Sequence, residues 1–243
     1  MASFVVNFAQ LNIGIDSKFD YTYKFCKEYL TDNEADFRVS ASEDEIKREM
    51  EDSPYNPLPP YAESICIYRE IADRLPEYDR CVFHGAVISY EGRGYLFTAP
   101  SGTGKTTHIR LWQKYLDGVE IVNGDKPILH ITEDGVTAYA TPYAGKEGYQ
   151  NKKSIKLSGI CLVEQAKENS IKRLNASECL LRIITQIYRP YDSAGVSKTL
   201  ELLDNMLKAV PVFSLGCDIS EDAVKCSYEA LVGKEYNGKN YED

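Results

Sequence analysis

The most constraining feature of the sequence is the stretch Ala99–Thr107, which reads Ala-Pro-Ser-Gly-Thr-Gly-Lys-Thr-Thr. A short apolar run, residues 95–98, precedes it, and an amphipathic run, residues 108–116, follows it. This order is typical of a phosphate-binding loop, in which a strand leads into a glycine-rich turn and a Gly-Lys-Thr opens the next helix. The glycines let successive backbone N–H groups converge on one concavity, and the helix N-terminus adds partial positive charge. The usual pattern opens with glycine, whereas this one opens with Ala99.

This loop predicts a nucleotide site with ATP, or another nucleoside triphosphate, and Mg²⁺ or Mn²⁺ as cofactors. Lys105 would reach the outer phosphates, and the Thr106 hydroxyl would contact the metal ion. The residues expected to bind the nucleotide are Ser101, Gly102, Thr103, Gly104, Lys105, Thr106 and Thr107. The alternative is a glycine-rich surface turn that precedes a helix without binding a ligand.

The charge and the cysteines restrict the class of protein. A net charge of −9 over 243 residues argues against a general nucleic-acid binder. We find no run long enough to span a membrane and no secretory signal, so we expect a cytoplasmic protein without a membrane partner. The seven cysteines are widely spaced, and no pair is separated by two residues. They therefore indicate small core residues rather than a zinc or redox motif.

Periodicity predicts one α/β domain over residues 1–243. The segment 54–60 contains four prolines and breaks regular structure. Residues 1–53 would form an N-terminal layer before this break, and the core would span about 80–232. Expected strands are 4–13, 119–122, 155–164, 170–174 and 211–215, with hairpins at 81–88/94–98 and 127–131/136–140. Expected helices are 43–50, 61–75, 176–188, 195–210 and 221–232, the first opened by a capping box of Ser42 and Glu45.

Two further residues are candidates for chemistry. Asp125 follows the strand 119–122, and the carboxyl ends of parallel strands meet at one edge, so this carboxylate is expected to face the loop. It could hold magnesium or accept a proton from an attacking hydroxyl, or it could be an ordinary turn residue of Asn-Gly-Asp. His84 ends an apolar run one strand away, where a structural role is the alternative. We expect His108 to face out from its helix or to pack beside the loop.

The arrangement of His84-Gly85, the loop and Asn123-Gly124-Asp125 resembles the kinase domain of HPr kinase/phosphorylase. The loop itself is similar to that of ATP-dependent phosphoenolpyruvate carboxykinase. The resemblance implies a P-loop core of this type, with a mixed β-sheet flanked by helices. It also implies that Thr106 and Asp125 hold the metal, and that Asp125 deprotonates the acceptor serine with His84 in support. Both families usually show two adjacent aspartates in this motif, and here the first is Gly124.

Two cations complete the set of candidates. Lys146 lies in the polar loop 141–153, which could close over a transferred phosphoryl group, although a solvent-exposed lysine is the alternative. Arg189 follows a predicted helix and is a candidate phosphate or acceptor clamp.

The sequence thus favours a Mg-dependent kinase acting on a serine hydroxyl of a small protein or peptide. The alternatives are a small carboxykinase-like enzyme and a non-catalytic nucleotide-binding regulator. Whether the chain forms an oligomer is left open.

Overall fold

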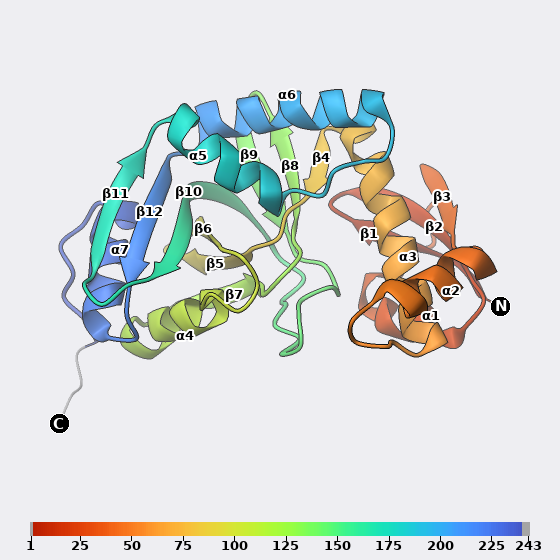
Figure 1. The fold of residues 1–243 in the computed structure, drawn as a ribbon, viewed down its shortest axis with the longest axis horizontal. Coiled ribbons are helices and arrows are strands. Elements are labelled where there is room, and N and C mark those ends of the chain that lie inside the picture. The colour runs from red at the N-terminus through yellow and green to blue at the C-terminus, as the bar shows by residue number, and fades with distance from the viewer. Residues whose placement is uncertain (1, 240–243) are drawn as a thin grey trace.

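The computed structural model describes residues 2–239, and the strands of this part of the chain form two β-sheets (Figure 1). The smaller sheet has three strands in the order β1-β2-β3 and belongs to residues 2–78, called here the N-terminal lobe. This lobe contains β1 (Ala2–Phe8), β2 (Leu11–Ser17), α1 (Asp20–Phe25), η1 (Lys27–Tyr29), β3 (Phe37–Ser40), α2 (Glu43–Asp52), α3 (Pro59–Arg74) and η2 (Leu75–Tyr78).

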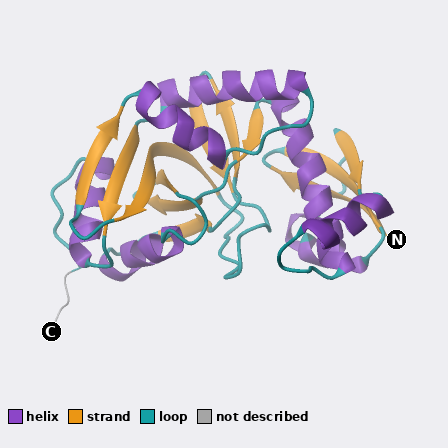
Figure 2. Cartoon of the chain, viewed as in Figure 1, coloured by secondary structure: helices purple, strands orange, loops and turns teal. Residues whose placement is uncertain are grey.

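The larger sheet has nine strands and occupies residues 80–232, called here the core lobe. Its main path is β4-β8-β9-β10-β6-β5-β7, and β12 joins β10 to β11. The strands are β4 (Arg80–Val82), β5 (Ala86–Tyr90), β6 (Arg93–Thr98), β7 (Glu120–Asn123), β8 (Ile128–Thr132), β9 (Gly135–Tyr139), β10 (Ser154–Gln165), β11 (Ser170–Leu174) and β12 (Val212–Cys217). The helices are α4 (Lys105–Tyr115), α5 (Ala176–Ile183), η3 (Ile184–Gln186), α6 (Ser193–Ala209) and α7 (Glu221–Val232). The mixed sheet flanked by helices agrees with the predicted α/β architecture (Figure 2), and the predicted type of P-loop core stays a prediction.

Helices cover both faces of the larger sheet because consecutive residues of β10 are apolar, so that both faces need to be buried. In β10, Ile160 and Leu162 pack with α5 and α6, whereas Cys161 and Val163 pack with α4 and α7. Trp112 of α4 is fully buried at the centre of the second group. All seven cysteines are free thiols, and five of them are buried, as expected of core residues.

The position of His108 differs from the prediction. Its side chain does not face out from α4, because the buried face of α4 packs against α7. The ring is 2% exposed and lies 3.0 Å from the Ser227 hydroxyl. Burial lowers the pKa of His108 to about 4, so this histidine is a neutral core residue.

Two predicted strands are each divided in the structure. The run 4–13 forms a hairpin, since Ala9 and Gln10 both have positive φ (51° and 66°) and reverse the chain between β1 and β2. The run 81–88 divides into β4 and β5, which pair with different neighbours. His84 therefore lies in the crossing between two strands, where its side chain can leave the sheet.

The direction of the strands brings three separated segments to one sheet edge. β5 pairs antiparallel with both β6 and β7, so β6 and β7 run in the same direction. Val87 lies in register with Leu96 on one side and Asn123 on the other. Consequently, the residues after β6, the residues after β7 and the residues before β5 all lie at the same edge.

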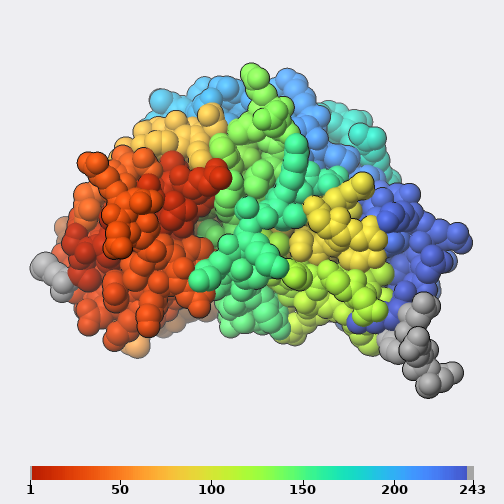
Figure 3. Space-filling model, turned by 180° about the vertical axis from the view of Figure 1, so that it is seen from behind, coloured from red at the N-terminus to blue at the C-terminus, as the bar shows by residue number. Residues whose placement is uncertain are grey.

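The N-terminal lobe contacts this edge through the loop 141–153. Tyr143 stacks on Tyr68 of α3 with ring centroids 3.8 Å apart, and the Tyr29 hydroxyl donates to Gln150 at 2.8 Å. Figure 3 shows this loop, in green, against the red N-terminal lobe. Among the described residues, no helix has the length and apolar character needed to cross a membrane.

Candidate functional site

The glycine-rich loop connects β6 to α4 as the sequence predicts. Gly102 and Gly104 have φ values of 79° and 111°, a backbone region that side chains with a Cβ rarely adopt. Gly104 is the N-cap of α4, so the free N–H groups of the first helical turn face the loop. The loop therefore has the backbone geometry that places amide donors and a helix N-terminus together.

Lys105 folds back into the loop. Its side chain is buried, and Nζ donates a 2.9 Å hydrogen bond to the backbone oxygen of Ala99. Burial lowers the pKa of Lys105, the charge of Asp125 acts in the opposite direction, and Lys126 lowers it further. The ammonium group thus shares one electrostatic environment with the residues that follow β7.

Asn123 builds the turn that carries Asp125. Its Oδ1 accepts from the backbone N–H groups of Asp125 (3.0 Å) and Lys126 (2.9 Å), and its Nδ2 donates to the Thr141 backbone oxygen (2.9 Å). The Asn123 side chain is fully buried. Asn123 therefore performs the turn-forming role, and the Asp125 carboxylate remains available for other contacts.

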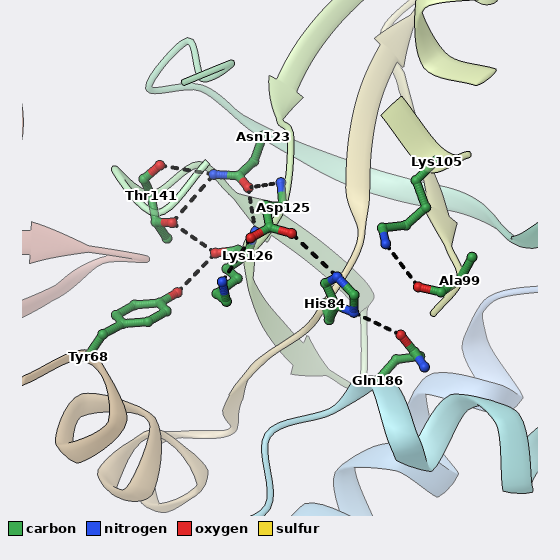
Figure 4. Close-up of polar contacts among 9 residues, drawn as sticks. All are labelled: Tyr68, His84, Ala99, Lys105, Asn123, Asp125, Lys126, Thr141 and Gln186. Carbon is green, nitrogen blue, oxygen red and sulfur yellow. Dashed lines mark hydrogen bonds and ion pairs between the residues drawn. The ribbon is translucent and has the colours of Figure 1, made fainter. Parts of the chain in front are cut away.

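Asp125 lies between two basic side chains (Figure 4). Its Oδ1 is 3.4 Å from Nε2 of His84, and its Oδ2 accepts from Nζ of Lys126 at 2.8 Å. Burial acts to raise the pKa of Asp125, but the contacts with His84 and Lys126 outweigh it and hold the pKa at about 2. The carboxylate is ionised at neutral pH, which both a metal ligand and a proton acceptor require.

Gly124 is enclosed where the resembled families have a second aspartate. Its N–H donates to Tyr149 O at 2.8 Å, and a Cβ at this position would lie 2.8 Å from the backbone oxygen of Ala144. The loop 141–153 occupies the space that a side chain would need. A single carboxylate therefore serves the turn after β7.

Two hydroxyl groups hold the backbone of Lys126 from outside the turn. Thr141 Oγ1 and the Tyr68 hydroxyl both donate to the Lys126 oxygen, at 2.8 and 2.9 Å. Thr141 begins the loop 141–153, and Tyr68 belongs to the N-terminal lobe. Sequence reasoning did not identify either residue, because nothing local to them signals this contact.

Gln186 contacts His84 from the end of η3. Its Oε1 lies 3.0 Å from Nδ1 of His84, and its backbone oxygen accepts from the His84 N–H at 2.7 Å. Gln186 was not a candidate either, since a glutamine at the end of a predicted helix gives no signal of its own. Asn123 could have been found, because it opens the Asn-Gly-Asp turn motif.

The two remaining cations lie on the surface. Lys146 is exposed, and its Nζ lies over the ring of Tyr55 at 5.9 Å from the centroid. Arg189 is exposed shortly after η3. Their proposed contacts with phosphate or acceptor stay predictions.

Mg²⁺ usually keeps several waters and takes one or two carboxylates plus phosphate oxygens. Asp125 offers an oxygen ligand of this kind, and its predicted pairing with the Thr106 hydroxyl around a metal ion stays a prediction. Among residues 2–239, no group of three or more His, Cys, Asp or Glu side chains could hold a metal by itself.

A separate cavity of about 640 Å³ lies in the N-terminal lobe. It is bordered by the ends of β1–β3 and by α2 and α3, and none of its lining residues belongs to the site described above. We place the candidate site at the sheet edge because the charged and conformationally unusual residues converge there.

Comparison with known proteins identifies a distant structural similarity. No family model matches the chain, and no curated protein matches it. Among solved structures, the chain is similar to the Hpr(Ser) kinase/phosphatase from Coxiella burnetii, with a TM-score of 0.36 and 10% sequence identity. The match covers 63% of this chain and 93% of that chain.

Proposed function

We propose that the chain binds ATP at residues 101–107 and transfers its terminal phosphoryl group to a serine hydroxyl of a small protein or peptide. The observation that supports this most is the meeting at one sheet edge of a glycine-rich loop with a buried lysine and an ionised aspartate contacted by histidine. The loop supplies donors for phosphate, and the aspartate supplies an acceptor for a hydroxyl proton.

The loop residues would bind the phosphates. Nζ of Lys105 would exchange its hydrogen bond to Ala99 for the outer phosphates, and the N–H groups around Gly104 would bind the phosphate oxygens. A bound Mg²⁺, held by Thr106 and Asp125, would neutralise charge on the phosphates. Lys126, beside Asp125, adds a second positive charge to this region.

Asp125 and His84 would accept the proton of the acceptor hydroxyl. The acceptor oxygen forms a bond to the terminal phosphorus, the bond from that phosphorus to the bridging oxygen breaks, and ADP leaves. The hydroxyl proton passes to the Asp125–His84 pair. Because the transition state of phosphoryl transfer is loose, a carboxylate with a pKa of about 2 suffices to orient the hydroxyl and to receive its proton late.

The experiment is calorimetric titration with ATP and Mg²⁺, followed by transfer from labelled ATP to proteins of a lysate from the host. Lys105→Ala is expected to abolish binding, whereas Lys225→Ala, an exposed lysine on α7, should leave binding unchanged. Asp125→Asn should keep binding and lose transfer. Wild-type protein that binds no nucleotide would contradict the proposal.

A second candidate is a nucleotide-binding regulator without catalysis. It is favoured by the enclosed Gly124 and by the contact of both Asp125 oxygens with protein cations. Tight ATP binding without turnover across all acceptors would support it. Nucleotide turnover that depends on oxaloacetate would instead indicate a carboxykinase-like enzyme.

A further inference from the structure

The negative charge of the protein is concentrated in the N-terminal lobe. Residues 2–78 hold 16 acidic and 8 basic side chains, whereas residues 79–239 hold 19 acidic and 20 basic side chains. A lobe with this imbalance attracts cationic partners and repels anionic ones. Because ATP is itself an anion, the acidic lobe does not serve to attract the nucleotide. The charge therefore points to a second partner, which is basic.

An exposed apolar surface lies on the same lobe. It consists of Tyr21 on α1, Tyr55 and Leu58 in the segment between α2 and α3, and Tyr61 in the first turn of α3, and is called here the tyrosine face. Tyr55 and Leu58 are 81% and 75% exposed. The rings of Tyr21 and Tyr61 meet with centroids 6.1 Å apart, and the Tyr61 N–H donates to the Leu58 backbone oxygen at 3.0 Å. Large apolar side chains gathered in this way mark an interaction surface.

A continuous series of ring contacts connects the tyrosine face to the candidate site. Tyr21 stacks on Phe25 with ring centroids 5.7 Å apart, and Phe25 meets Tyr143 edge-on at 5.0 Å. Tyr143 in turn stacks on Tyr68 at 3.8 Å, and the Tyr68 hydroxyl donates to the backbone oxygen of Lys126. These three ring-to-ring steps span at most about 15 Å, the length of roughly five extended residues. One peptide segment can therefore reach both the site and the tyrosine face.

Two exposed carboxylates flank the tyrosine face. Asp20 precedes Tyr21, and Asp52 ends α2 three residues before Tyr55. Neither carboxylate takes part in an ion pair among residues 2–239. The face already accepts one cation, because Nζ of Lys146, in the loop 141–153, lies over the Tyr55 ring at 5.9 Å from the centroid (Figure 1).

We propose that the tyrosine face, together with Asp20 and Asp52, is the docking surface for a basic segment of the acceptor protein, in which lysine or arginine side chains lie near the target serine. The aliphatic stems of these side chains would cover the rings, and their charges would face the two carboxylates. The excess of negative charge on the lobe disfavours an acidic segment. The docking surface stands on the contacts above, whereas the identification of its partner as the acceptor rests on the proposed function.

Capture of a peptide library on the immobilised full-length protein tests the charge preference. Each peptide carries one central serine between randomised positions, and the capture is carried out without nucleotide. Retained peptides should be enriched in lysine and arginine and depleted of aspartate and glutamate. Enrichment of acidic residues, or retention without any charge preference, would overturn the docking surface, and so would the absence of any retained peptide.

The affinity of one retained basic peptide, measured by fluorescence anisotropy, tests the residues. Asp20→Asn combined with Asp52→Asn should weaken binding roughly threefold per carboxylate, the effect of an exposed ion pair, and by less at high salt. Tyr55→Ser, at a position that is 81% exposed, should weaken binding roughly two- to fivefold through the lost cation–π contact. Lys24→Gln removes a positive charge from the side of α1 that carries Tyr21, so it should strengthen binding.

Asp32→Asn combined with Glu34→Gln is the matched control, because it removes the same charge from the same lobe. Both residues are exposed, and their loop contacts Asn12 at the start of β2, whereas Asp20 follows the end of this strand. The length of β2 exceeds the Debye length of about 8 Å at physiological salt, so the control should leave the affinity unchanged. An equal loss from both pairs would show that the lobe attracts peptides by net charge alone and would overturn the docking surface.

Transfer assays with the same peptide separate this inference from the proposed function. Variants of the tyrosine face should raise KM for the peptide and leave kcat unchanged. Peptides that bind with the expected charge preference but are not phosphorylated would contradict the proposed function and leave the docking surface in place. Phosphorylation of an acceptor whose basic residues can be replaced without loss of affinity would contradict the docking surface alone.

Discussion

The hydroxyl of Tyr68, on α3 of the N-terminal lobe, donates a 2.9 Å hydrogen bond to the backbone oxygen of Lys126, the residue that follows Asp125. The Tyr68 ring also stacks on Tyr143, whose backbone oxygen accepts from the Lys126 N–H at 3.1 Å. Both backbone groups of Lys126 are thus held by this aromatic pair. The N-terminal lobe therefore supports the turn that carries the candidate carboxylate.

Tyr68→Phe should cost about 1 kcal/mol of unfolding free energy, because it removes one of the two hydroxyl donors to Lys126 and leaves Thr141 Oγ1 in place. ATP affinity should not change, since the glycine-rich loop is untouched, whereas transfer should slow as the turn loosens. Urea unfolding and calorimetry measure the two effects. The half-exposed Tyr23 offers a matched control, Tyr23→Phe, and equal stability of both variants would count against this contact.

Gly124→Ala should lose about 1–3 kcal/mol of stability, because its Cβ would lie 2.8 Å from the backbone oxygen of Ala144. Gly124→Asp, which restores the aspartate of the resembled families, should lose at least as much. Gly216→Ala is a suitable control, since its Cβ would meet a side-chain carbon at 3.2 Å instead of a backbone oxygen. A Gly124→Asp protein as stable as wild type would contradict this prediction, because it would show that the loop 141–153 can move away from residue 124 without a loss of stability.

Local signals predicted the parts of the site that depend on backbone chemistry. The Gly-Lys-Thr motif predicted the loop before α4, and the Ser42–Glu45 capping box forms as expected at the start of α2. The hairpin of β8 and β9 was also predicted. In each case, the residues that fix the conformation lie within a few positions of one another.

Contacts between distant segments could not be predicted in this way. Gln186 reaches His84 only because η3 ends above the crossing between β4 and β5. The Ala9-Gln10 turn contains no glycine, so its left-handed backbone has no sequence signal. His108 was misplaced because helical periodicity does not reveal that α7 packs against α4. These features depend on tertiary packing.

Lys105→Met should leave the free protein as stable as wild type, or slightly more stable, because burial already disfavours the charge of Lys105. Nucleotide binding should nevertheless be lost. Wild-type protein at an ATP concentration of about 100 times Kd should gain about 2.7 kcal/mol of stability, and Lys105→Met should gain none. Thermal unfolding with and without ATP measures both. A variant that is still stabilised by ATP would remove Lys105 from the nucleotide site.

The acid dependence of stability tests the ion pairs of Asp125. The pKa of this carboxyl is lowered in the folded protein from 3.8 to about 2, so its stabilising contribution is complete above pH 3.8 and is lost as the pH falls through 2. Compared with Asp125→Asn, wild-type protein should lose about 2 kcal/mol of unfolding free energy between these two pH values. Lys126→Met removes one of the two partners, so its loss should be smaller and should be complete at a higher pH. Urea unfolding at a series of pH values gives the comparison. Parallel curves for wild type and Asp125→Asn would show that the contacts with His84 and Lys126 do not stabilise the ionised carboxylate.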